Sequence, residues 1–176
     1  MNVIVRPGVS LADFLDWERR QPLRFEFDGT QPIPMTGGAV GHARLVRRIV
    51  AALSRLLPAG FEAFGGDLKV PTAPNRIRYP DALVLRGDPP PDADTVAPVV
   101  VFEVLSPSTM LTDLRVKPEE YAAAPSVLAY VILPQDGPAG ATVLRRATGW
   151  VAEAAGDALE LPEIGVTIDV SALYGD

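Results

Sequence analysis

The amino-acid sequence predicts an α/β (α+β) fold, in which helices pack on a mixed β-sheet. Residues 40–57 have the apolar spacing of a long amphipathic helix, and residues 99–105 form an apolar run typical of a strand buried on both faces. Proline- and glycine-rich loops separate several shorter apolar runs. We find no internal repeat and no linker, so we expect residues 1–176 to form a single domain.

The N-terminal part predicts a helix, a hairpin and a second helix. Ser10 and Asp13 have the spacing of a capping box, which starts a short helix ending at about Arg20. Residues 23–30 alternate and then turn at Asp28-Gly29, and residues 31–35 complete the hairpin. The apolar face of the long helix at 40–57 comprises Leu45, Val46, Ile49, Val50, Leu53, Leu56 and Leu57.

The remaining chain predicts strands around one helical segment at about 109–124. The expected strands cover residues 61–70, 77–85, 98–105, 127–133, 142–146, 150–154, 158–161 and 166–170. Short glycine turns separate the last four strands, and a proline-rich loop at 87–91 precedes the central one.

Two carboxylates lie beside apolar strands. Glu103 is inside the run at 99–105, and Asp81 precedes another run at 82–85. A buried charge is costly unless it is paired or binds a metal. Because Mg²⁺ needs only one or two carboxylates besides waters and substrate oxygens, Asp81 and Glu103 could hold one ion between antiparallel neighbouring strands. The alternative is that Asp81 ends a loop and Glu103 pairs with a buried arginine.

These residues also carry a resemblance to known nucleases. Pro-Asp at 80–81 and Glu-Val-Leu at 103–105 resemble the PD-(D/E)xK nuclease superfamily, with Leu105 in place of the usual lysine. More specifically, the chain resembles the Uma-two family of restriction endonucleases, in which the lysine lies on the following helix. The matching positions are Glu103-Val-Leu-Ser-Pro-Ser-Thr109, Asp113, Lys117, Tyr121, Arg24-Phe-Glu26-Phe-Asp-Gly29 and His42.

The resemblance implies a restriction-endonuclease-like fold and a Mg²⁺-dependent DNA endonuclease, with Mn²⁺ as a substitute metal. It implies that Asp81 and Glu103 are metal ligands and catalytic residues. Lys117 would polarise the attacking water or the scissile phosphate, and Glu26 would be an auxiliary acid that completes the metal site. A homodimer is compatible with this activity, because cutting both strands of DNA usually takes two sites.

Pro118 leaves two arrangements open for Lys117. One continuous helix would place Asp113 and Lys117 on the same face. However, Pro-Glu-Glu at 118–120 is typical of a helix start, which would break the segment and put Lys117 at a cap. In that case Lys69, the other lysine of the chain, could take its place.

The charge of the chain opposes a nucleic-acid partner without excluding one. The formal net charge is −6 and the pI is about 4.8, whereas DNA-binding domains usually carry a basic patch. The arginines on the helix at 40–57 could contact phosphates or form an ordinary solvated face: Arg44, Arg47, Arg48 and Arg55. A non-catalytic module that binds nucleic acid or protein, and a hydrolase of small phosphoesters, are the competing functions.

Composition excludes several other classes. The chain contains no cysteine, which excludes disulfides and thiolate metal sites, and its single histidine, His42, excludes multi-histidine sites. His42 could be a cap, a surface group or a member of the site. No apolar run approaches the roughly 20 residues that span a bilayer, and the first residues do not resemble a signal peptide. We therefore expect a cytoplasmic protein without membrane contact.

Overall fold

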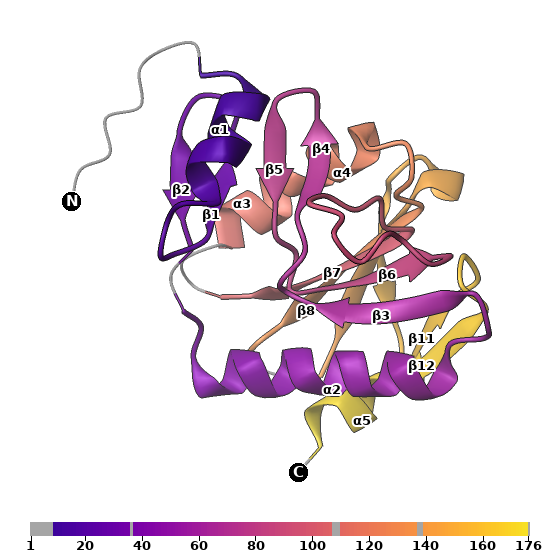
Figure 1. Cartoon of the computed structure of the whole chain (residues 1–176). Coiled ribbons are helices and arrows are strands. Elements are labelled where there is room, and N and C mark those ends of the chain that lie inside the picture. The colour runs from indigo at the N-terminus through magenta and orange to yellow at the C-terminus, as the bar shows by residue number, and fades with distance from the viewer. Residues whose placement is uncertain (1–8, 36, 107–109, 137–138, 176) are drawn as a thin grey trace.

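The computed structural model describes residues 9–35, 37–106, 110–136 and 139–175. Its centre is a mixed six-stranded sheet of order β10-β9-β8-β7-β6-β3 (Figure 1). β7 and β8 pair in parallel and the other neighbours are antiparallel, which confirms the predicted fold class. The strands are β10 (Ala152–Ala155), β9 (Ala141–Arg145), β8 (Ala129–Pro134), β7 (Val100–Leu105), β6 (Ala82–Arg86) and β3 (Phe61–Gly65).

A second sheet, of order β2-β1-β5-β4, lies beside the N-terminal helix. It consists of β2 (Pro32–Pro34), β1 (Phe25–Phe27), β5 (Arg76–Arg78) and β4 (Val70–Ala73), and the helix is α1 (Leu11–Glu18). Phe14 of α1 stacks on Phe27 of β1 with ring centroids 4.6 Å apart. The capping box of Ser10 and Asp13 and the turn at Asp28-Gly29 both form as predicted.

Helices cover both faces of the central sheet. One face carries α2 (Val40–Leu56), α5 (Val170–Tyr174) and the hairpin of β11 (Ala158–Leu161) and β12 (Val166–Asp169); the other carries α3 (Met110–Arg115) and α4 (Lys117–Ala123). A 3₁₀ turn, η1 (Arg146–Thr148), follows β9. No helix within the described ranges combines the length and apolarity needed to cross a membrane.

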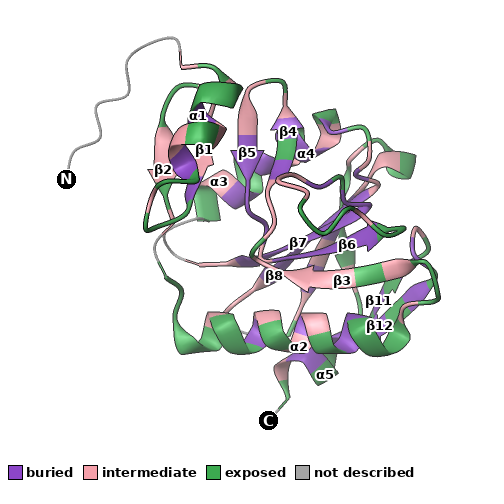
Figure 2. Cartoon of the chain, in the orientation of Figure 1, coloured by how far each residue is buried: buried purple, intermediate pink, exposed green. Residues whose placement is uncertain are grey.

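Side-chain alternation in β7 decides which face its residues reach. Phe102 and Val104 pack in the core beneath α2, whereas Val101 packs with Tyr121 and Tyr130 on the face of α4. Successive residues of a strand point to opposite faces, so Glu103 shares the face of Val101. Figure 2 shows that the central strands β6 and β7 are buried along most of their length.

Two predicted strands are each divided between the two sheets. The predicted strand at 61–70 is β3 in the central sheet and β4 in the second sheet, and the one at 77–85 is likewise β5 and β6. β3 pairs with β6 and β4 pairs with β5, so this segment is a long hairpin bent between two sheets. The bend occurs at Gly65-Gly66 in one arm and at Pro80, which has no N–H for a ladder, in the other.

A buried ion-pair network joins the second sheet to α4. The Arg78 side chain is 2% exposed; its Nε and Nη2 donate to the two carboxylate oxygens of Glu120 at 2.6 and 2.8 Å. Its Nη1 donates to Glu26 Oε2 of β1 at 2.9 Å. Burial alone would raise the pKa of Glu120, but hydrogen bonds from Arg78 and Arg76 outweigh it and lower this pKa.

We expect Glu120→Gln to lower the free energy of unfolding by about 3 kcal/mol at neutral pH, because it removes one partner of a buried pair. The pKa of Glu120 is lower in the folded state, so its stabilisation is present above about pH 4.5 and is lost as the pH falls through the folded value. The gap between wild type and variant should therefore shrink in acid, as measured by urea unfolding. Glu119→Gln, on the exposed side of the same turn, is the control; an equal effect there would contradict the assignment.

Candidate active site

Asp81 and Glu103 come together at one end of the β6–β7 pair. The antiparallel register places Ala82 opposite Phe102, so the next position outward brings Asp81 opposite Glu103. Asp81 and Glu103 therefore occupy opposing positions of neighbouring antiparallel strands, while the reach of both carboxylates to one cation stays a prediction. The hydrogen-bonded register of β6 with β7 ends at the pair Ala82–Phe102, so Asp81 lies just beyond the last paired residue of β6.

The Asp81 carboxylate is held by the sheet and by α2. Its Oδ2 accepts a hydrogen bond from the backbone N–H of Val104 at 2.7 Å and lies 3.1 Å from Nε2 of His42 in the first turn of α2. The hydrogen bond with Asp81 raises the pKa of His42. His42 is therefore a member of the site and not a surface group.

Glu103 is buried between a lysine and a tyrosine. Lys117 Nζ lies 2.7 Å from Glu103 Oε1, and the Tyr121 hydroxyl donates to the same oxygen at 3.1 Å. Burial raises the pKa of Glu103, and the Lys117 ammonium acts in the opposite direction. The prediction that Lys117 Nζ lies on the Glu103 side of the sheet, within one hydrogen bond of this acid, is confirmed.

Lys117 is surrounded by three carboxylates. Besides Glu103, its Nζ lies 2.8 Å from Asp113 Oδ1 and 4.0 Å from Glu26 Oε1, and its side chain is 6% exposed. Burial alone would lower the pKa of Lys117, but the three acids together raise it. The surrounding acids therefore favour the ammonium form of Lys117.

The helix is interrupted before Lys117, yet the Asp113–Lys117 pair survives. α3 ends at Arg115 and α4 begins at Lys117, with Pro118 in its first turn. Val116 keeps right-handed helical backbone angles, and its N–H donates to the Thr112 carbonyl at 2.9 Å. The chain therefore keeps turning through the break, and residues four apart still meet.

Tyr130 of β8 contacts both helices on this face of the sheet. The Tyr130 hydroxyl of β8 donates to the Asp113 backbone carbonyl at 3.0 Å, and the Tyr121 and Tyr130 rings lie 4.9 Å apart. Asp113 is 1% exposed, and the described residues offer no hydrogen-bond donor to its Oδ2. The sequence contains no local signal for the role of Tyr130, since it is one apolar position of a buried strand.

Glu26 lies near the site but is bound to protein groups. Its Oε2 accepts from Arg78 at 2.9 Å, and its Oε1 accepts from the Tyr79 backbone N–H at 3.2 Å. Among the described side chains, no three His, Asp or Glu residues converge to hold a metal ion. The expected metal set of Asp81, Glu103 and Glu26 is therefore not assembled, and Glu26 belongs to the network around Arg78.

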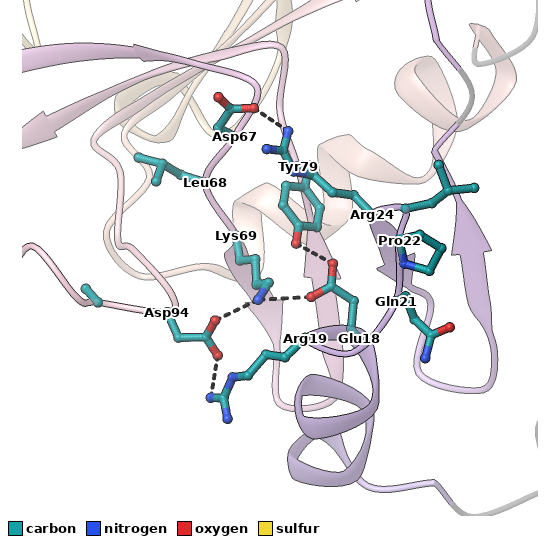
Figure 3. Close-up of a pocket in the computed structure, with 12 residues that line it drawn as sticks. Glu18, Arg19, Gln21, Pro22, Arg24, Asp67, Leu68, Lys69, Tyr79 and Asp94 are labelled. Atoms are coloured by element: carbon teal, nitrogen blue, oxygen red, sulfur yellow. Dashed lines mark hydrogen bonds and ion pairs between the residues drawn. The ribbon is translucent and has the colours of Figure 1, made fainter.

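Lys69 lies in a different place from Lys117. Its Nζ contacts Asp94 Oδ1 at 2.6 Å and Glu18 Oε2 at 3.0 Å, at a hollow of about 410 Å³ (Figure 3). The Tyr79 hydroxyl also donates to Glu18 there, at 2.8 Å. These contacts hold α1 against the loop at 92–96. Lys69 therefore does not take the place of Lys117, which is the lysine that contacts Glu103.

The ion pair of Lys117 predicts a pH effect on stability. In Lys117→Met, burial of Glu103 is unopposed, so its folded pKa rises further above the ordinary 4.5. Between the two values the folded chain retains a proton that the unfolded chain has lost, so stability falls as the pH rises. We expect the unfolding free energy of this variant to fall by about 2 kcal/mol more than that of wild type between about pH 5 and pH 8.

Urea unfolding in EDTA measures this difference. Lys117→Met combined with Glu103→Gln should reduce the extra pH dependence, because the titrating carboxyl is gone. Identical pH profiles for wild type and Lys117→Met would contradict the ion pair.

Comparisons with known proteins identify the family of the chain. The Uma2 family profile, described as "Putative restriction endonuclease", matches residues 11–171. "Uncharacterized protein slr1290" of Synechocystis sp. (strain ATCC 27184 / PCC 6803 / Kazusa) is 30% identical over 177 residues, covering 96% of this chain and 92% of that protein. The crystal structure of "a putative nuclease belonging to DUF820" from Anabaena variabilis ATCC 29413 superposes with a TM-score of 0.77 at 15% identity, covering 95% of this chain and 98% of that one. The chain has the fold of that structure, and it belongs to the Uma2 family.

Proposed function

We propose that this protein is a Mg²⁺-dependent endonuclease that hydrolyses DNA phosphodiester bonds. The observation that carries the proposal is the contact of 2.7 Å between Lys117 Nζ and Glu103 Oε1, beside Asp81 on the neighbouring strand. Two acids that could hold a metal ion, with an ammonium near them, are groups that metal-assisted phosphodiester cleavage can use. Membership of a family described as restriction endonucleases supports the same activity.

The donor set fits a magnesium ion with few protein ligands. Asp81 and Glu103 would hold it, since Mg²⁺ is commonly bound by one or two carboxylates and completes its shell with water and phosphate oxygens. When bound, the ion would activate water and neutralise charge on the scissile phosphate.

The protonation state of Lys117 limits its role. Because neighbouring acids raise the pKa of Lys117, its side chain is suited to donate a hydrogen bond and not to accept a proton. It can donate a hydrogen bond to the attacking water or to a phosphoryl oxygen as negative charge develops there. Asp113 opposite Glu103 would keep the ammonium in place during this step.

Metal-dependent cleavage is the direct test. The purified protein should cut DNA with Mg²⁺ or Mn²⁺ and stop with EDTA, and Glu103→Gln should lower cleavage at least about 100-fold because it removes a charged ligand while keeping its shape. Glu62→Gln, an exposed acid of the same sheet, is the control and should cleave normally. Normal cleavage by Glu103→Gln would contradict the metal role.

The two competing functions give different outcomes of that assay. Hydrolysis of model phosphodiesters without cleavage of DNA would favour a small-phosphoester hydrolase, which suits the net charge of −6. No hydrolysis of either substrate would favour a non-catalytic binding module that keeps the nuclease fold.

Lys117 and Lys69 provide a test variant and a matched control for the proposed role of the lysine. Lys117→Ala should lower turnover about 100-fold or more while Mn²⁺ binding is retained, because the ammonium stabilises charge but does not bind the metal. Lys69→Ala removes the same charge at the hollow of Figure 3 and should leave turnover within about twofold of wild type. Single-turnover cleavage and calorimetric Mn²⁺ titration measure the two quantities. Equal turnover in both variants would contradict a role for Lys117.

A further inference from the structure

α2 is a basic helix in an acidic protein. It carries four arginines and neither aspartate nor glutamate between Val40 and Leu56. At 3.6 residues per turn the four side chains lie within an arc of about 100° around the helix axis, away from the apolar face. We call this set the arginine face of α2: Arg44, Arg47, Arg48 and Arg55.

The arginine face is not neutralised by the rest of the protein. Within the described ranges, none of its four members lies within 4.0 Å of a carboxylate; the one polar contact found for the set joins Arg48 to the Leu173 carbonyl at 3.2 Å. Other arginines of the chain do pair with acids: Arg19, Arg20, Arg24, Arg76, Arg78 and Arg145. The net charge of −6 therefore conceals a local excess of positive charge.

The arginine face runs along the side of α2 that points away from His42, because two residues advance about 200° around the helix axis. His42 of the first turn of α2 contacts Asp81, and Arg44 lies two residues further along the helix. From Arg44 to Arg55 the helix rises about 16 Å, a length over which duplex DNA presents about ten phosphates. Arg44, Arg47 and Arg55 are exposed to solvent, on a helix whose outer side is largely exposed in Figure 2.

We infer that the arginine face of α2 binds the phosphate backbone of duplex DNA. The inference rests on the proposed function for its ligand, and charge complementarity carries it: guanidinium groups that have no carboxylate partner among the described residues, gathered on one side of a helix, match a polyanion. Phosphate contacts of this kind position DNA without reading its sequence.

Fluorescence anisotropy of a labelled duplex, with Ca²⁺ in place of Mg²⁺ to prevent turnover, tests the inference across a series of salt concentrations. Replacing Arg44, Arg47 and Arg55 by Gln should weaken binding at least tenfold at low salt and lower the slope of log K against log salt by about 2–3, because each phosphate contact contributes about 0.9. Replacing the same three residues by Lys keeps the charge and should restore most of the binding.

A control with the same change in net charge separates a binding face from total charge. Arg19, Arg20 and Arg24 are exposed and lie on or near α1, each paired with an aspartate. Their replacement by Gln should leave the salt slope unchanged. An equal loss in both triple variants, or no loss in the α2 variant, would overturn the inference.

The experiment also distinguishes this inference from the proposed function. If wild type binds through α2 but cuts no DNA with Mg²⁺ or Mn²⁺, the proposed activity fails and the binding face stands. If wild type cuts DNA and the α2 variant keeps the wild-type salt slope, the binding face fails and the activity stands. Absence of any DNA binding by wild type would overturn both.

Discussion

The buried ammonium of Lys117 is the interaction on which the candidate site depends. It joins the start of α4 to Glu103 in the centre of the sheet and to Asp113 on α3. Removing one member would leave a charge buried without a partner, and such changes are strongly destabilising. Neighbouring acids that favour the ammonium therefore also fix the position of the two helices on this face of the sheet.

A second layer of ion pairs surrounds the first. Arg78 holds Glu120 of α4 and Glu26 of β1 at the same time, and Glu26 in turn lies 4.0 Å from Lys117. The second sheet is thereby tied to the helix that presents the lysine. Geometry of this kind, in which functional side chains are held by charged and hydrogen-bonded partners, is what preorganises a catalytic site. The same partners explain why Glu26 is near the site without being free to bind a metal.

Sequence reasoning worked where local periodicity and pairing rules decide the structure. The apolar spacing of 40–57 identified α2, and antiparallel pairing of two apolar runs brought Asp81 next to Glu103. Sequence reasoning failed where the structure depends on which distant strand a segment pairs with. The alternation of residues within 61–70 and 77–85 does not reveal that each segment contributes to two different sheets. The network around Arg78 was likewise hidden, because its carboxylate partners lie 42 and 52 residues away. Pro118 correctly indicated a break, but not that the chain would keep its right-handed turn through Val116.

In the proposed site, Asp81 and Glu103 share one divalent cation beside an ammonium that does not bind it. Anomalous diffraction from crystals soaked in Mn²⁺ tests this most directly. We expect one manganese peak within coordination distance of a carboxylate oxygen of each acid, about 2.0–2.2 Å, with Lys117 Nζ outside its coordination shell. A peak bound by only one of the two acids, or manganese only in the hollow beside Glu18 and Asp94, would contradict it.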